Sequence, residues 1–252
     1  KSSKIKFYSL NLRKGKPAVI NSLIKKTTGE IIIINDADWI FKVKNKEKLL
    51  EFLSVFDNLK VGGIAESFPV EWDKSNINKA NFGFKVTAMG SYFWMLYQKK
   101  KFTERFGELT KLKSPTMFLT NIFRKELFEE NTSLGDDFER TFDIMNKGYE
   151  IVLFEDISLP RMVCSYNQVK LTELYKQKIR TSLARKQLKD LNRAPKTHYY
   201  PLATFLIFFY SLREGLSSVY VGIWIYINLM ATMVSKFKKP DTGKNWRIRL
   251  KR

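Results

Sequence analysis

The sequence predicts an α/β fold, because short apolar runs alternate along the chain with segments of helical periodicity. Four consecutive isoleucines, Ile31 to Ile34, give the plainest strand signal, since a half-exposed strand would alternate apolar and polar residues. Phe138, Phe142 and Met145 recur at helical spacing, and Gly148 ends that segment. With 252 residues, 44% of them hydrophobic, the chain is long enough to bury a core.

The first third of the chain predicts a strand–helix–strand unit. A short strand is expected at residues 4–10, and Gly15-Lys16-Pro17 opens a helix that ends near residues 28–29. The isoleucine strand, residues 30–35, is expected to be buried on both faces and to pair in parallel with the first strand through a right-handed crossover.

The later elements follow the same two periodicities. The Gly62-Gly63 pair most simply permits close packing or a bend, although a phosphate cradle is an alternative. Residues 76–101 are rich in aromatic side chains and fit either a core helix or a membrane-interface segment. The expected elements are a helix at 47–59, a strand at 60–65, a strand or loop at 114–124, a helix from 134, a strand at 149–154 and a helix from 172.

The charge balance narrows the classes of partner. The 45 Lys and Arg against 25 Asp and Glu give a formal charge of +20, which attracts nucleic acid, anionic lipid or phosphorylated substrates. The single cysteine, Cys164, excludes an internal disulfide framework and fits a reducing compartment. The single histidine, His198, excludes a zinc site built from several histidines.

The composition becomes strongly apolar after Pro195. Residues 199–212 form a short apolar run, and residues 216–234 form one long enough to span a bilayer, although two buried helices would give the same pattern. From Lys236 onward the tail holds eight basic residues and one acid. Under the positive-inside rule both ends of this helical pair lie in the cytoplasm, and the tail favours anionic lipid over nucleic acid.

Three polar motifs occur in order along the α/β part. Asp36 and Asp38 follow the isoleucine strand, one residue apart, so both can address one hard cation. Asp136 and Asp137 stand at a predicted helix start, and Gln177-Lys178-Ile179-Arg180 places Gln177 and Arg180 on one face of a later helix. Each motif alone is a weak signal, because Asp-x-Asp is also common in solvated turns.

In this order the motifs resemble those of the family 2 glycosyltransferases, inverting enzymes of the GT-A fold. The segment Gly15-Lys16-Pro17-Ala18-Val19-Ile20-Asn21 is similar to the family's Gly-Lys-x-x-Ala-x-Asn segment. The resemblance implies a Rossmann-like mixed sheet flanked by helices, a nucleotide-sugar donor, and Lys16 and Asn21 close to that donor. It covers roughly residues 4–186, with Thr181 where the family has tryptophan.

The resemblance also implies roles for the acids. Asp38, and less directly Asp36, would hold a divalent cation, Mg²⁺ or Mn²⁺, on the donor diphosphate. Asp137 would be the general base toward the acceptor, supported by Asp136. A helix N-terminus lowers the pKa of a carboxyl, so the base strength of Asp137 would have to come from desolvation or from Asp136.

Gln177 and Arg180 would contact the acceptor sugar or the diphosphate, where a cation stabilises leaving-group charge. A solvated helix face is an equal alternative for Gln177. The acceptor is expected to be a lipid phosphate or a glycan, and no nucleic acid is expected as a partner.

We expect two domains: a catalytic domain at 1–195 and a membrane-associated helical pair with a basic tail at 196–252. Because the family begins with a strand–helix–strand half that binds the nucleoside, the catalytic domain is expected to be truncated at its N-terminus. The expected location is the cell membrane, with the catalytic domain on the cytoplasmic side. Two other functions stay open, a catalytically inactive membrane scaffold and a basic nucleic-acid-binding protein.

Overall fold

The structure is a computed structural model, and the elements below lie within the residues that it describes. These are residues 6, 8, 15–36, 39–65, 79–115, 120–130, 132–164, 166–193, 200–213, 215 and 217–238. The strand expected at residues 4–10 lies outside this description.

A six-stranded mixed sheet forms the centre of the α/β part, with the strand order β1-β6-β3-β7-β5-β4. Only the β3–β7 pair is parallel among the pairings of the described strands; the others are antiparallel. The described partner of β1 is therefore antiparallel β6. The strands are β1 (Ile31–Ile33), β3 (Val61–Ile64), β4 (Thr103–Phe106), β5 (Leu109–Leu112), β6 (Ile122–Arg124) and β7 (Glu150–Leu153).

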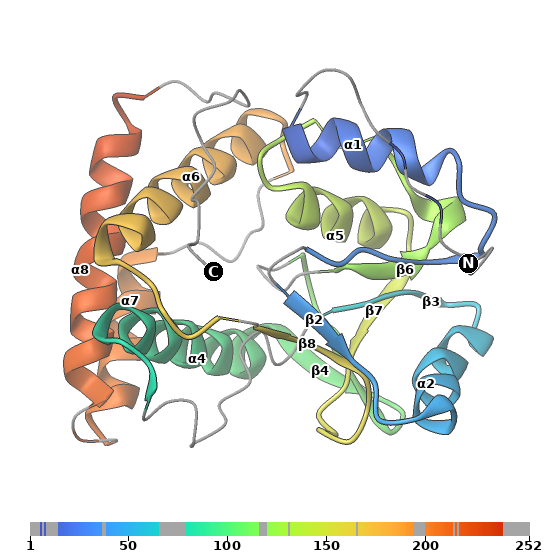
Figure 1. The fold of residues 1–252 in the computed structure, drawn as a ribbon, viewed down its shortest axis with the longest axis horizontal. Helices are drawn as coiled ribbons and strands as arrows, with labels where there is room; N and C mark the ends of the chain where they lie inside the picture. The colour runs from blue at the N-terminus through green and yellow to red at the C-terminus, as the bar shows by residue number, and fades with distance from the viewer. Residues whose placement is uncertain are drawn as a thin grey trace.

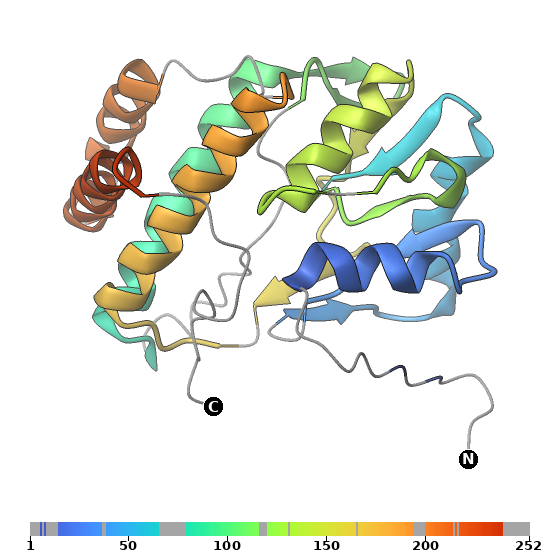
Figure 2. The same cartoon turned by 90° about the horizontal axis from the view of Figure 1, so that it is seen from above.

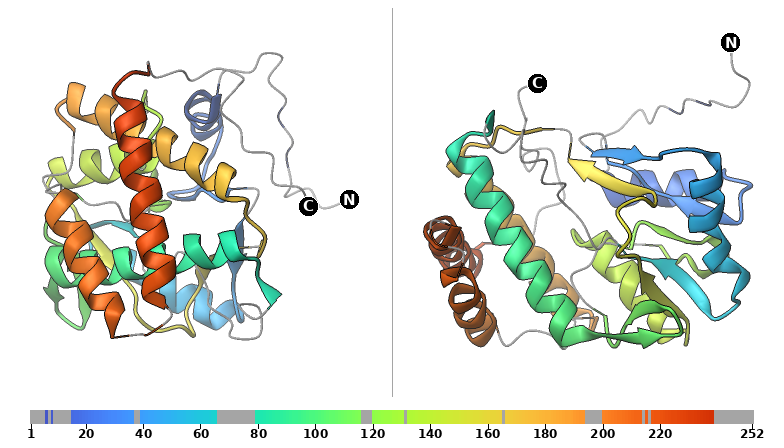
Figure 3. Two further views of the ribbon diagram at one scale, coloured as in Figure 1. Left: turned by 90° about the vertical axis from the view of Figure 1, so that its left-hand side faces the viewer. Right: turned by 90° about the horizontal axis from the view of Figure 1, so that it is seen from below.

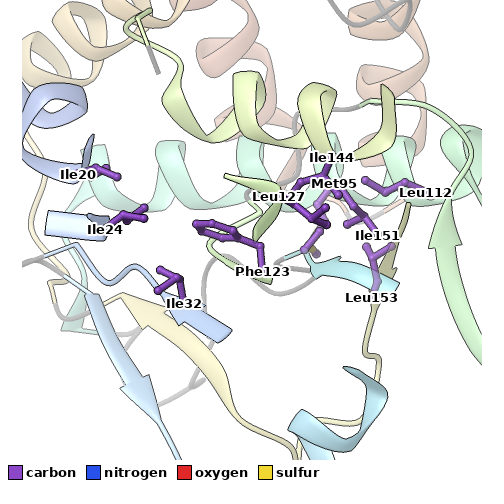
Figure 4. Close-up of a cluster of buried hydrophobic side chains, with 11 residues drawn as sticks. Ile20, Ile24, Ile32, Met95, Leu112, Phe123, Leu127, Ile144, Ile151 and Leu153 are labelled. Atoms are coloured by element: carbon purple, nitrogen blue, oxygen red, sulfur yellow. The ribbon is translucent and has the colours of Figure 1, made fainter. Parts of the chain in front are cut away.

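Helices cover both faces of this sheet. On one face, Ile20 and Ile24 of α1 (Gly15–Ile24) and Ile144 of α5 (Asp136–Asn146) pack with Ile32 and Phe123, as Figure 4 shows. On the other face a second cluster joins the sheet to α2 (Lys46–Leu53) and the short helix η1 (Ser54–Asp57). The mixed α/β prediction is confirmed. The buried sheet side chains of the second cluster are Val61, Ile64, Ile122 and Val152.

The expectation that the isoleucine strand is buried on both faces is wrong. Ile32 is buried, but Ile33 is 38% exposed. Ile33 shares a face with Ile31. The second cluster, which joins the sheet to α2, includes Ile31 but not Ile33. The strand therefore has a buried face and a face that opens to solvent toward its carboxyl end, next to Asp36.

The glycine pair in β3 serves close packing. A Cβ at Gly62 would lie 2.7 Å from side-chain atoms of Ile144, Leu127 and Tyr149, and one at Gly63 would lie 2.8 Å from Thr120 Cγ2. The packing interpretation of this pair is therefore right, because α5 sits directly on the strand.

Two antiparallel strand pairings were not expected from the sequence. β2 (Trp39–Lys42) pairs with β8 (Arg161–Cys164) as a separate two-stranded sheet, and β4 pairs with β5 across a turn at Gly107, whose φ is +60°. The β2–β8 partners are more than 100 residues apart, so no local turn signal marks them.

Four long helices extend the molecule away from the sheet (Figures 1 and 2). α4 (Phe82–Phe102) and α6 (Leu171–Asp190) lie between the α/β part and the α7–α8 pair. The ambiguous segment 76–101 is thus largely the helix α4, packed on both sides. A short helix, η2 (Lys125–Leu127), completes the helical elements, with α7 at Tyr200–Leu212 and α8 at Ser217–Ser235.

Among the described residues, α8 is the one helix that is long and apolar enough to cross a membrane, and α7 is shorter. A buried helix of a soluble protein can pass the same test of length and composition. In α8, however, only 28% of the apolar window is buried. The division of the chain at residue 195 stays a prediction.

Candidate active site

A lysine on α1 joins two of the acidic motifs. Lys16 Nζ lies 3.0 Å from Oδ1 and 3.2 Å from Oδ2 of Asp36, and 3.5 Å from Oδ2 of Asp136. Lys16 is in the first turn of α1, Asp36 follows β1, and Asp136 is the first residue of α5. The Lys16 segment and the two acidic motifs therefore meet where one strand ends and two helices begin.

The local sequence explains why α5 starts at this place. Asp136, Asp137 and Glu139 occupy its first turn, where carboxylates interact favourably with the positive end of the helix dipole. Gly135 precedes them, and a Cβ there would lie 3.1 Å from Phe138 Cδ2 and 3.4 Å from Ala184 Cβ of α6. The tighter of these contacts is to Phe138 in α5 itself, and the distance to Ala184 of α6 is an ordinary van der Waals contact.

Asp136 forms a buried ion pair with Arg140 one turn along α5. Arg140 Nη2 lies 3.1 Å from Asp136 Oδ2, and the two side chains are 1% and 3% exposed. Arg140 Nη1 donates to the backbone oxygen of Thr120 at 2.7 Å and to Oδ1 of Asn121 at 3.3 Å. Its guanidinium also lies 5.0 Å from the centre of the Phe123 ring. Arg140 thus fixes the first turn of α5 against the beginning of β6.

Asp137, the second residue of α5, is partly exposed. Burial, and secondly the negative charge of Asp136, raise the pKa of Asp137 above its ordinary value of 3.8, while Lys16 and Arg140 act in the opposite direction. The sequence expectation of base strength from desolvation and from Asp136 agrees with this balance. A raised pKa makes the ionised carboxylate a stronger base.

Lys16 carries the compensating positive charge. Its burial lowers the pKa, but the charges of Asp136, Asp137 and Asp36 outweigh this effect and raise the pKa above 10.5. The ammonium is therefore charged at neutral pH. It is 28% exposed, so it remains reachable from solvent.

A third acid on α5, Glu139, binds the loop that leads into the site. Glu139 is fully buried, accepts hydrogen bonds from the backbone N–H of Thr132 (3.1 Å) and Ser133 (3.0 Å), and pairs with Arg193 beyond α6. Arg193 Nη2 also lies 3.4 Å from Oδ1 of Asp143. Burial raises the pKa of Asp143 to about 6, against the attraction of Arg193. This network holds residues 132–135, and hence the start of α5, against the end of α6.

The contacts of α6 with the start of α5 come from residues that follow the Gln177–Arg180 motif. Gln187 Oε1 accepts from the backbone N–H of Leu134 at 2.9 Å, and Ala184 packs near Gly135. Arg180 lies one helical turn before Ala184 and is partly exposed, whereas Gln177 is exposed. Asn21 is on α1, one turn after Lys16, and is partly exposed. Ion pairs join Lys16, Asp36 and Asp136; they do not extend to Gln177 or Arg180 within the described part of the chain.

The predicted cation site is only partly described. Asp38 lies outside the described residues, and within them no group of three or more His, Cys, Asp or Glu side chains is arranged to hold a metal ion. Asp36 supplies hard carboxylate oxygens, is 43% exposed, and is already paired with a cation, the Lys16 ammonium. Carboxylate oxygens are the ligand type that Mg²⁺ and Mn²⁺ prefer, and the divalent cation stays a prediction.

Sequence reasoning did not single out Arg140, Glu139 or Arg193. Arg140 had a detectable signal, because Asp136 and Arg140 are an acid–base pair at helical i, i+4 spacing. Glu139 and Arg193 are 54 residues apart and gave none. Arg124, at the end of β6, donates from Nε to the backbone oxygen of Val61 at 2.8 Å. This hydrogen bond links β6 to β3.

The fold and the site together define a mixed α/β protein in which carboxylates and a lysine lie close together at the end of β1, a strand at the edge of the sheet. The family model for glycosyl transferase family 2 matches residues 1–131, more than half of the chain, and the chain belongs to this family. The match includes Lys16, Asn21 and Asp36, and ends before Asp136. Comparison with curated proteins found no match, and comparison with solved structures found none.

Membership of the family identifies the chain as a glycosyltransferase, an enzyme that needs a nucleotide-sugar donor and an acceptor. The six-stranded mixed sheet flanked by helices fits a GT-A-like fold.

Proposed function

We propose that the chain transfers a hexose from a nucleotide-sugar donor to a lipid-phosphate or glycan acceptor, with inversion at the anomeric carbon, at the cytoplasmic side of a cell membrane. The observation that supports this proposal is the convergence of Lys16, Asp36 and Asp136, with Asp137 beside them, at the end of β1. Such a site offers positive charge for a diphosphate and a carboxylate for a proton.

Asp137 is the proposed general base. An acceptor hydroxyl gives its proton to the Asp137 carboxylate while its oxygen forms the new bond to the anomeric carbon. The bond from that carbon to the diphosphate oxygen breaks on the opposite face, and its electron pair leaves with the nucleoside diphosphate. A phosphate acceptor is already ionised, and Asp137 then orients it. The raised pKa of Asp137 supports the first of these tasks.

Lys16 is the proposed contact to the donor phosphates, with Asn21 nearby on α1. Its ammonium is held by Asp36 and Asp136, so it is oriented before a donor binds. A divalent cation held by Asp36 and Asp38 would neutralise charge on the departing diphosphate. Arg180, and with it Gln177, is proposed on the acceptor side, where a guanidinium can pair with phosphate oxygens.

The proposal is tested with the full-length protein and a panel of nucleotide sugars, with and without Mg²⁺ or Mn²⁺. Release of nucleoside diphosphate is measured for the unaltered protein, for Asp36→Asn and for Asp57→Asn, which changes an exposed aspartate on η1. Asp36→Asn is expected to lower turnover about 100-fold or more, because donor charge stabilisation is lost. Asp57→Asn is expected to have no effect. Unchanged turnover in Asp36→Asn would contradict the proposed donor site.

A further inference from the structure

The α7–α8 pair has a buried stripe and an exposed stripe, and both are apolar. In α7 the buried residues Ala203 and Ile207 recur at four-residue spacing, and in α8 Val221, Trp224 and Ala231 do the same at helical spacing. The opposite sides expose large apolar side chains. They include Phe205 (59%), Phe209 (50%), Tyr226 (63%) and Met233 (57%).

Such exposure is unusual for a helix that merely covers a soluble domain, whose outer face is normally polar. Figures 1 and 3 show both helices on the side of the molecule farthest from the sheet, with α4 and α6 behind them. The exposed apolar stripes therefore belong to an outer layer of the molecule. We call this layer the α7–α8 face.

The inner side of α8 packs against α6 and α4. Lys178 Nζ of α6 lies 4.7 Å from the centre of the Trp224 ring, near the middle of α8, and Ser182 of α6 lies 3.3 Å from Thr232. On α4, a Cβ at Gly90 would overlap the Trp224 ring at 2.0 Å. α8 is thus backed by α4 and α6 along its central turns.

The packing of α8 on α6 limits the orientations that α8 can take relative to a bilayer. α6 carries eight charged residues, and a spanning α8 would carry Lys178 and its neighbours to the depth of the hydrocarbon. A Lys or Arg side chain at that depth is costly, because its charge loses its hydration. A helix pair that lies flat keeps α6 in water and still buries its outer stripe.

The ends of the pair carry the charge that an anionic surface attracts. Arg213 is exposed at the turn between α7 and α8, and Lys236 and Lys238 are exposed after the last turn of α8. At the side of α7, Lys100 Nζ lies 3.3 Å from the hydroxyl of Tyr210. Cationic groups therefore lie at both ends of the apolar stripe, where they can contact the headgroups of an anionic lipid surface.

We propose that the α7–α8 face docks flat on an anionic lipid surface, with both helices in the plane of the interface and without spanning the bilayer. The inference rests on the membrane association proposed above and is independent of the sugar chemistry. It differs from the bilayer-spanning geometry that the apolar run 216–234 suggested, because it takes account of what α8 packs against.

Binding is tested by flotation of the full chain with phosphatidylcholine vesicles, with or without phosphatidylglycerol. Binding is expected with phosphatidylglycerol and should weaken at high salt. Phe209→Ser is expected to weaken binding about tenfold, whereas Leu59→Ser, which alters a 78% exposed leucine after η1, should not. Lys236→Gln should weaken binding about fivefold only on anionic vesicles, with exposed Lys60→Gln as its control.

Orientation is tested separately by spin labels placed through Val219→Cys, Tyr226→Cys and Met233→Cys in a Cys164→Ala background. The account predicts a similar, shallow depth for all three labels on vesicles. A spanning helix would place the Tyr226 label deepest, because about 10 Å of helix separates it from each of the others, and that result would overturn the proposal. A stable dimer in solution that Phe209→Ser converts to monomer, with no vesicle binding, would also overturn it. Sugar transfer is not needed for either measurement, so failure here leaves the proposed chemistry to its own test.

Discussion

Arg140 Nη2 lies 3.1 Å from Asp136 Oδ2, and this ion pair is almost completely shielded from solvent. The pair connects the acid cluster to the core, because Arg140 also bonds to the backbone of Thr120 and lies over Phe123. Removing one partner of a buried ion pair destabilises the folded protein strongly, because the other charge is left buried and unpaired.

Arg140→Met should therefore destabilise the protein by about 3–5 kcal/mol, since it leaves Asp136 buried without its closest cation. Urea unfolding measures this loss. The double variant Asp136→Leu/Arg140→Met should recover part of it, because no unpaired charge remains. A double variant less stable than Arg140→Met would show that the pair does not couple as the geometry indicates.

Lys16→Met should move the acid limb of the pH–rate profile to higher pH. The positive charge of Lys16 lowers the pKa of Asp137, so its removal raises that pKa further and delays the formation of the carboxylate as the pH rises. The profile of kcat/KM against pH measures this shift. Lys25→Met, at an exposed residue near the end of α1, is the control. An unshifted acid limb in Lys16→Met would remove Asp137 as the titrating base.

Asp143→Asn should stabilise the protein at about pH 7.5 and have a smaller effect at about pH 5. Burial raises the pKa of Asp143 to about 6 from 3.8, so the folded protein keeps a proton that the unfolded chain has released between these values. The cost of the buried charge is absent below this window and complete above it, at most about 3 kcal/mol. Urea unfolding of both proteins at the two pH values measures it. An equal difference at both values would contradict the assignment.

Gly90→Ala should separate α4 from α8. The added Cβ would lie 2.0 Å from Trp224 Cγ, a collision with the ring at its attachment point, and overpacking of this kind costs roughly 1–3 kcal/mol. Gly222→Ala is the matched control in α8, because its nearest atom would be at 3.6 Å and alanine favours helix. The midpoint temperature of thermal unfolding should fall for Gly90→Ala and rise slightly for Gly222→Ala. A neutral Gly90→Ala would mean that the two helices are less closely packed.

The sequence predicted the strands and helices that have strong local signals. The isoleucine run, the glycine pair of β3 and the helix that Gly148 ends all form close to the expected residues. Pairings between distant segments were missed, because β2 and β8 are short and meet only through the tertiary fold. The prediction that both faces of β1 are buried was wrong, because the apolar pattern of a strand does not say how far the covering helix extends.

The residues that hold the site were harder to predict than the residues that form it. The acidic pairs stood out because carboxylates at a strand end and a helix start are chemically informative. Glu139 and Arg193 did not, since charged residues on helices usually face water, and only the folded chain brings them together. The proposed flat membrane geometry likewise depends on the contact between Lys178 and Trp224, which a hydropathy profile does not contain.

The central claim is that Asp137 accepts the proton of the acceptor in a glycosyltransferase site. The most direct measurement is the rate of sugar transfer to a hydroxyl acceptor by the full-length protein and by Asp137→Asn, with Asp190→Asn, at an exposed residue of α6, as the control. We expect Asp137→Asn to lose transfer by about 100-fold or more while keeping donor binding and thermal stability. Transfer at the unaltered rate by Asp137→Asn would contradict the account.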